Sequence, residues 1–141
     1  MTSSTSFRIS TTAKSALAQR AAREHTSATA LLEQLIVEGI RQLDHPGIGF
    51  RGSGGARRAG LAAGPDVWGI VSRLQELAGS EEDRIAVLSA ETMLHPRLIR
   101  VALDYAAAHP DDVQARIDDN RTATDEARQM TRNRQALLGL P

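Results

Sequence analysis

The chain has no cysteine, few aromatic residues and no long apolar run, and each of these absences narrows what it can be. Without cysteine it has no disulfide, no thiolate metal ligand and no thiol nucleophile. Two Phe, one Tyr and one Trp among 141 residues leave a core of Leu, Ile, Val and Ala, which favours helices over a large sheet. No segment reaches the roughly 18 apolar residues of a membrane span, and MTSSTSFRIS lacks the apolar core of a signal peptide. We therefore expect a soluble, cytoplasmic protein without membrane contact.

Charge of one sign is not in excess either, because 17 Lys and Arg balance 17 Asp and Glu. Bulk charge therefore does not direct the whole chain to nucleic acid. The local distribution is uneven: residues 1–27 are basic, with Glu24 as their one acid, and residues 104–126 are acidic. The two ends of the chain are thus suited to different partners.

Alternation of apolar and polar residues marks residues 5–10 as a half-buried strand. Phe7 and Ile9 share one face, and Ser6, Arg8 and Ser10 share the other. Thr11 or Thr12 can cap a helix that runs to about Glu24. Ser27 can cap a second helix, whose broad apolar face is formed by Leu31, Leu32, Leu35, Ile36, Ile40 and Leu43.

A single strand cannot form a sheet, and the second helix exposes more Leu and Ile than the first can cover. Both deficits disappear if two chains pair about a two-fold axis, so we expect a homodimer. An antiparallel ribbon of two such strands fits the DNA major groove, with Ser6, Arg8 and Ser10 facing the bases. Backbone N–H groups of Thr26 and Ser27 can hold a phosphate.

The middle of the chain contains turn signals followed by helical ones. Residues 48–51 and 57–62 can pair as a β-hairpin around Gly52–Gly55, and the alternative is a disordered Gly-Arg linker. Pro65 and Asp66 open one helix, Ser80 caps another and Pro96 starts a third. Such a set of short helices is similar to a helix-turn-helix domain.

The last part of the chain, residues 111–141, is polar up to Gln135 and then ends in leucines. We expect this tail to be partly helical or disordered and to be available to a partner. Its candidate partner-binding residues are Arg128, Arg132, Arg134, Leu137 and Leu138.

The sequence contains no residue pattern that is typical of a catalytic site. The four histidines lie in turns far apart, and the acidic clusters at residues 81–83 and 111–112 stand where helices begin, which explains them by dipole compensation. Gly52–Gly55 lacks the lysine and the strand-loop-helix order of a phosphate-binding loop. We expect no enzyme, no cofactor and no metal site.

Residues 5–43 resemble the ribbon-helix-helix superfamily of MetJ/Arc type, through SFRIS, a short connection and the helices around Leu17 and Leu31–Leu43, with Ser27 in the capping position. The resemblance implies an intertwined dimer whose outward strand residues, here Ser6, Arg8 and Ser10, contact DNA. It also implies a place among bacterial antitoxins and small repressors.

Residues 44–119 resemble the domain-of-unknown-function 433 family of antitoxins, through the runs His45–Ile48, Pro65–Trp68, Gly79–Glu82 and Ile99–Tyr105. The Gly-Thr-Arg-Ile run usual before the first helix is replaced here by Arg57–Gly64, so only the fold is transferred. The two resemblances together imply an antitoxin of a type II toxin-antitoxin system that neutralises a PIN-like ribonuclease toxin and represses its own operator.

The sequence therefore predicts a mainly α protein of three parts. Residues 1–43 form the ribbon-helix-helix dimerisation and DNA-binding domain, residues 44–110 a small helix-turn-helix-like domain, and residues 111–141 a tail that contacts the toxin. Two alternatives stay open: a stand-alone ribbon-helix-helix repressor, and a dimerising adaptor that does not bind DNA.

Overall fold

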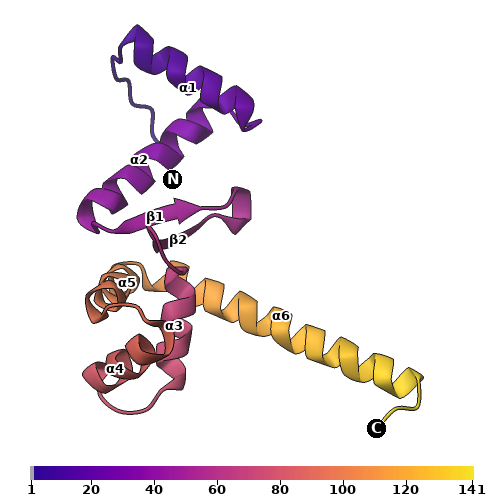
Figure 1. The fold of residues 1–141 in the computed structure, drawn as a ribbon. Helices are drawn as coiled ribbons and strands as arrows, with labels where there is room; N and C mark the ends of the chain where they lie inside the picture. Colours follow the sequence, from indigo (N-terminus) through magenta and orange to yellow (C-terminus); the bar gives the residue numbers. More distant parts are fainter. Residues whose placement is uncertain (1) are drawn as a thin grey trace. The chain divides into compact units, whose positions relative to one another are not determined.

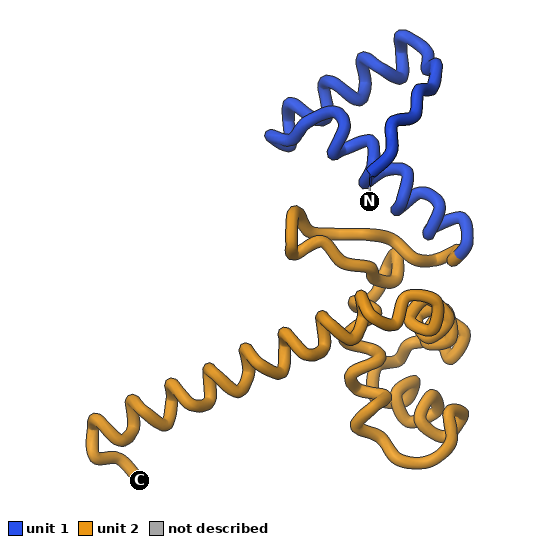
Figure 2. The backbone as a smooth tube through the Cα atoms, turned by 180° about the vertical axis from the view of Figure 1, so that it is seen from behind, with its two compact units in different colours: residues 1–44 blue, residues 45–141 orange. Residues whose placement is uncertain are grey.

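The computed structural model describes residues 2–141 and shows a mainly helical chain with one two-stranded antiparallel sheet (Figure 1). The elements follow in the order α1 (Thr11–Arg23), α2 (Ala28–Asp44), β1 (Ile48–Arg51), β2 (Arg58–Leu61), α3 (Val67–Glu76), α4 (Glu81–Thr92), α5 (Pro96–Ala108) and α6 (Pro110–Leu137). Two compact units divide the chain, unit 1 at residues 1–44 and unit 2 at residues 45–141 (Figure 2). Among the described residues, no helix combines the length and the apolar character needed to cross a bilayer.

Unit 1 consists of residues 2–10, which have no regular secondary structure, followed by α1 and α2. The half-buried strand predicted at residues 5–10 is not formed within one chain, because the described residues offer no second strand to pair with it. Ser10 caps α1, since its Oγ accepts a hydrogen bond from the N–H of Ala13 at 3.1 Å. The predicted cap at Thr11 or Thr12 is therefore wrong, because both residues already lie in the first turn. The predicted cap of α2 is confirmed: Ser27 Oγ accepts from the N–H of Ala30 at 3.0 Å.

The connection between α1 and α2 is a tight left-handed turn. His25 has φ 54°, and its N–H donates to the carbonyl of Ala22. The next residue, Thr26, donates to the carbonyl of Ala21 at 3.0 Å. This pair of bonds satisfies the last carbonyls of α1 and reverses the chain over two residues.

Unit 1 buries very little of its apolar surface within one chain. Ala21 and Leu31 are its buried residues among those described, at 3% and 2% exposure. The remaining apolar side chains of α2 are largely exposed; they are Leu32, Leu35, Ile36, Val37, Ile40 and Leu43. A helix pair with two buried side chains is well short of the core of an independent domain.

Unit 2 begins with the predicted hairpin, which the structure confirms. β1 pairs antiparallel with β2 from Ile48 opposite Leu61 to Arg51 opposite Arg58. Gly52 starts the reversal with φ 89°, where a Cβ would lie 2.6 Å from the carbonyl oxygen of Ala56. Glycine is thus required at this position, and the alternative of a disordered linker is wrong.

Helices α3, α4 and α5 pack with the hairpin and the start of α6 around one core. Its largest fully buried side chains are Val67, Ile85, Ile99, Tyr105 and Ile117. Ser80 and Asp83 form a reciprocal capping box at the start of α4, as the sequence predicts for Ser80. His95 Nδ1 accepts from the N–H of Arg97 and so caps α5.

The C-terminal region is one continuous helix of 28 residues, α6, rather than a partly ordered tail. Val113 and Ile117 on its first two turns are buried in the core of unit 2, at 6% and 1% exposure. From residue 118 onward every residue of α6 is exposed. This part of the helix extends away from α3, α4 and α5 (Figure 1). The helix therefore has an anchored start and an exposed remainder, residues 118–137, which we call the distal helix; a hydrogen bond from Arg121 to Gln75 of α3, at 3.0 Å, joins its first turn to the rest of unit 2.

Candidate functional site

The residues predicted to face DNA bases lie in the segment before α1. Ser6 and Arg8 are exposed there, as are Phe7 at 81% and Ile9 at 50%. Within the described chain this segment belongs to no sheet. Ser10 differs from its neighbours, because its hydroxyl oxygen is already the acceptor that caps α1. A hydroxyl that accepts one hydrogen bond can still donate another, so Ser10 keeps one donor for a ligand.

The two backbone N–H groups predicted to hold a phosphate, those of Thr26 and Ser27, lie at the start of α2. The N–H of Thr26 is engaged in closing the end of α1, so the expectation that it is free is wrong. The physical reason is the left-handed His25, which directs the following N–H back toward the helix. Ser27 stays at the N-terminus of α2, where the first amides have no acceptor within the helix. No hydrogen bond among the described residues joins Ser6 or Arg8 to Ser27.

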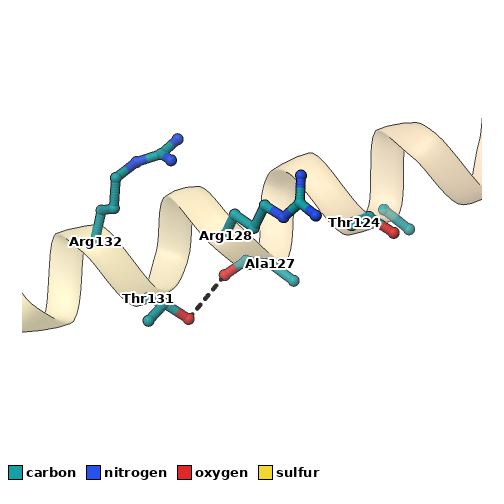
Figure 3. A pocket seen from close by; sticks show the side chains of 6 residues that line it. Thr124, Ala127, Arg128, Thr131 and Arg132 are labelled. Carbon is teal, nitrogen blue, oxygen red and sulfur yellow. Dashed lines mark hydrogen bonds between the residues drawn. The ribbon is translucent and has the colours of Figure 1, made fainter.

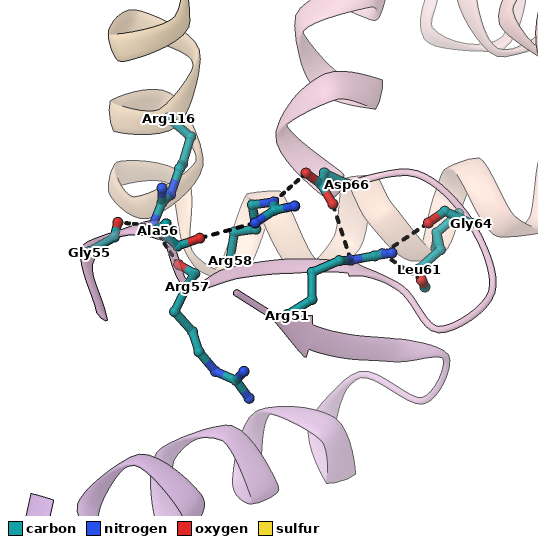
Figure 4. Close-up of polar contacts among 9 residues, drawn as sticks. All are labelled: Arg51, Gly55, Ala56, Arg57, Arg58, Leu61, Gly64, Asp66 and Arg116. Atoms are coloured by element: carbon teal, nitrogen blue, oxygen red, sulfur yellow. Dashed lines mark hydrogen bonds and ion pairs between the residues drawn. The ribbon is translucent and has the colours of Figure 1, made fainter. Parts of the chain in front are cut away.

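A cluster of arginines that the sequence did not predict as a site lies beside the hairpin (Figure 4). Arg51 Nε lies 3.1 Å from Asp66 Oδ1, and Arg58 Nε lies 2.6 Å from Asp66 Oδ2. Asp66 is the N-cap residue of α3, but its carboxylate makes no capping bond because these two arginines occupy it. One carboxylate therefore ties both strands of the hairpin to the start of α3.

A third guanidinium reaches the hairpin from α6. Arg116 Nη2 donates to the carbonyl oxygens of Gly55 and Arg57 in the loop between the strands (Figure 4). Gly60 leaves room for the cluster, since a Cβ at this position would overlap the guanidinium of Arg51. We call Arg51, Arg58 and Arg116 the hairpin arginines. The sequence signal for Arg51 and Arg58 is a run of 20 residues, 45–64, that contains three arginines, with Arg57 as the third, and no acid. Arg116 lies far outside this run.

The predicted partner-binding residues lie on the distal helix and at its end, with Arg128 and Arg132 one turn apart and Arg134 on a different face. Arg128 and Arg132 extend from α6 beside a shallow open hollow whose floor is formed by the small residues Ala123, Thr124, Ala127 and Thr131 (Figure 3). Arg132 donates a hydrogen bond to Gln129 at 2.8 Å, and Arg128 forms a loose ion pair with Asp125 at 4.0 Å. Leu137 and Leu138, at 86% and 72% exposure, are left uncovered by residues 2–141.

The histidines are not arranged as metal ligands. His45 and His109 pack their rings against the buried Tyr105, with ring centroids 5.3 and 4.7 Å from the tyrosine ring. His95 is a helix cap. Among residues 2–141, no group of three or more histidine or acidic side chains could hold a metal ion.

Comparison of the chain with protein-family models, curated proteins and solved structures gives no significant match.

Proposed function

We propose that this chain is a homodimeric DNA-binding antitoxin, which represses its own operator through a ribbon-helix-helix unit and neutralises a PIN-like ribonuclease through the distal helix. The observation that carries the proposal is in unit 1. A segment of alternating apolar and polar residues, which forms no strand within one chain, precedes two helices whose apolar face is exposed. A second copy of the same chain would supply both a strand partner for the segment and cover for the apolar face of the helices.

Pairing two copies about a two-fold axis joins the two segments as an antiparallel ribbon. Phe7 and Ile9 of both chains then face inward, over the apolar side chains of α2 that one chain leaves exposed. Burial of each Leu, Ile or Phe contributes about 1.5–3 kcal/mol, so this face can supply the core that unit 1 lacks. An intertwined dimer follows from the physical requirement to cover this surface.

Such a ribbon presents the opposite side of the segment to the major groove. Arg8 is the residue best suited to identify a base, because its planar fork pairs with two acceptors of guanine at once. Ser6 can donate to a base edge or to a phosphate, and Ser27 at the start of α2 can hold a phosphate. Ser10 is restricted to donating, since its oxygen caps α1.

The distal helix is the part of unit 2 best placed to contact a nuclease. Its arginines, Arg128, Arg132 and Arg134, can pair with the carboxylates that a ribonuclease of this type uses to hold metal ions. Leu137 and Leu138 offer apolar contact area beside them. Because the helix is exposed on every side, a partner can bind it without rearranging the core of unit 2.

The experiment measures binding of the full-length protein to its own promoter and to an unrelated duplex. Arg8→Ala should reduce the preference for the promoter by about 1–3 kcal/mol for each base that the arginine recognises. Arg23→Ala is the matched control, because it removes the same charge from unit 1 at the end of α1. If Arg8→Ala binds the promoter as well as the wild type does, Arg8 is not a base-reading residue. If the wild type binds no DNA at all, the chain is an adaptor.

A further inference from the structure

We infer that the hairpin arginines form a second nucleic-acid contact, in unit 2, which binds the phosphate backbone of duplex DNA without regard to sequence. The inference goes beyond the proposed function, which assigns DNA binding to unit 1 alone. It rests on the charge, the rigidity and the surroundings of Arg51, Arg58 and Arg116.

The first observation is an excess of positive charge. Arg51 and Arg58 share the single carboxylate of Asp66, and Arg116 donates to the carbonyls of Gly55 and Arg57. A carbonyl is neutral, so these bonds fix the guanidinium of Arg116 without cancelling its charge. The cluster thus carries three cations against one anion, in a chain whose net charge is zero. A local positive potential of this kind attracts a polyanion.

The second observation is that the cluster is already held in place. Arg51 Nη2 donates to the carbonyls of Leu61 and Gly64 at 2.8 and 2.9 Å, in addition to its ion pair with Asp66. Arg58 donates to Ala56 as well as to Asp66. Side chains fixed in this way lose little conformational entropy when a ligand binds, unlike flexible surface lysines.

The guanidinium groups also keep donors for a ligand. Both hydrogen bonds of Arg116 come from Nη2, which leaves Nε and Nη1. The side chains of Arg51 and Arg58 are 39% and 34% exposed, so water reaches them and a phosphate oxygen can replace that water. Arginine pairs with two oxygens of one phosphate, which suits it to a backbone contact.

The surroundings favour a duplex over a single strand. Proteins that bind single strands use exposed aromatic rings on which the bases stack. Phe50, Trp68 and Tyr105, which are the aromatic residues of unit 2, instead lie in or against its core. The hairpin therefore offers phosphate contacts without a stacking surface, as a regular double helix requires.

The test measures how the affinity of the full-length protein for an unrelated duplex depends on salt. Arg116→Gln should weaken binding, and the slope of log affinity against log salt should become shallower by about 0.9 for each phosphate that is no longer neutralised. Arg116→Lys should keep most of the affinity because it keeps the charge. Arg100→Gln is the matched control: it removes the same charge from α5 of unit 2, where Arg100 pairs with Glu82 at 2.8 Å, and should leave the slope unchanged.

Each outcome decides the inference. Weaker binding with Gln together with retained binding with Lys supports a phosphate contact. Equally weak binding with both residues, accompanied by a lower melting temperature in both, shows that Arg116 only clamps the loop and overturns the inference. Unchanged binding with both residues, or tighter binding of a single strand than of the duplex, overturns it as well.

The same measurements separate this inference from the function proposed for unit 1. Arg8→Ala should narrow the difference between promoter and unrelated duplex, whereas Arg116→Gln should weaken both by the same factor. If Arg8→Ala changes nothing, the ribbon proposal fails, and the salt slopes of the Arg116 variants still decide whether unit 2 binds a duplex.

Discussion

Arg73 of α3 and Glu91 of α4 form a two-pronged ion pair, with Nη2 2.6 Å from Oε1 and Nε 3.0 Å from Oε2. The same guanidinium reaches Glu76 on its own helix at 2.9 Å. The hydrogen bonds from Arg73 lower the pKa of Glu91 below its ordinary value of 4.5, because they stabilise the carboxylate over the acid. Arg73 thus links two helices of unit 2 through a carboxylate that stays charged in mild acid.

The first prediction concerns the pH dependence of this link. A carboxyl group whose pKa is lower in the folded state adds stability above its unfolded pKa, and this stability is lost as the pH falls through the folded pKa. We expect Glu91→Gln to lower the melting temperature near neutral pH, and the gap from the wild type to close well below pH 4.5. Thermal scans across this range check it. Glu126→Gln, an exposed change on α6, should show no such closing gap.

The second prediction concerns the end of α4. Met93 adopts a left-handed conformation, φ 63°, with its side chain 89% exposed. Glycine takes this conformation without the steric cost of a Cβ, about 1–2 kcal/mol, and the exposed Met side chain contributes little packing. We expect Met93→Gly to stabilise unit 2 by about 1 kcal/mol in denaturant unfolding. Met130→Gly, inside α6, should instead destabilise the helix, since glycine there costs about 1 kcal/mol.

The third prediction addresses the dimer. Ile9→Asp places a charge at the centre of the proposed ribbon, and burying an unpaired charge is far more costly than the apolar contact it replaces. We expect light scattering to report two chains per particle for the wild type and one for the variant, with unit 1 unfolded and unit 2 still melting cooperatively. Ser6→Asp adds the same charge to the opposite face of the segment and should remain dimeric. A monodisperse wild-type monomer with a folded unit 1 would refute the dimer.

The fourth prediction addresses the nuclease contact. Removing all of α6 would also remove Val113 and Ile117 from the core, and the loss of such buried side chains costs about 2–5 kcal/mol for each large one. Truncation after Thr122 spares them, together with the hydrogen bond from Arg121 to Gln75 at 3.0 Å. We expect this shortened chain to keep dimerisation and DNA binding and to lose inhibition of the cognate ribonuclease in a cleavage assay. Full inhibition by the shortened chain would place the contact elsewhere in unit 2.

Features controlled by neighbouring residues could be predicted from the sequence. Ser27 and Ser80 cap helices, and the glycines after Arg51 reverse the hairpin, because capping and turn formation depend on a few adjacent backbone groups. The cap at Ser10 could not be predicted, since Ser10, Thr11 and Thr12 cap almost equally well and local preference cannot choose among them.

Features created by distant residues could not be predicted in this way. From its position Asp66 is expected to cap α3 with its carboxylate. The carboxylate instead pairs with Arg51 of β1 and Arg58 of β2, which are close to it only in the folded chain. Apolar periodicity does not predict that α6 is continuous, but the absence of helix-breaking residues does. Between Pro110 and Gly139 there is neither proline nor glycine, so nothing interrupts the helix even where no face is buried.

The anchored start of α6 has a consequence for the turns beyond it. A lone helix in water is limited by nucleation, because the first turn fixes several residues for a single hydrogen bond. The packing of Val113 and Ile117 supplies that nucleus, so the distal helix needs only to propagate from a turn that already exists. Helicity should therefore decline gradually toward Leu137, and amide hydrogen exchange should quicken turn by turn in the same direction. A ligand that binds the last turns would slow amide hydrogen exchange along the whole distal helix, because each stabilised turn also stabilises the turn before it.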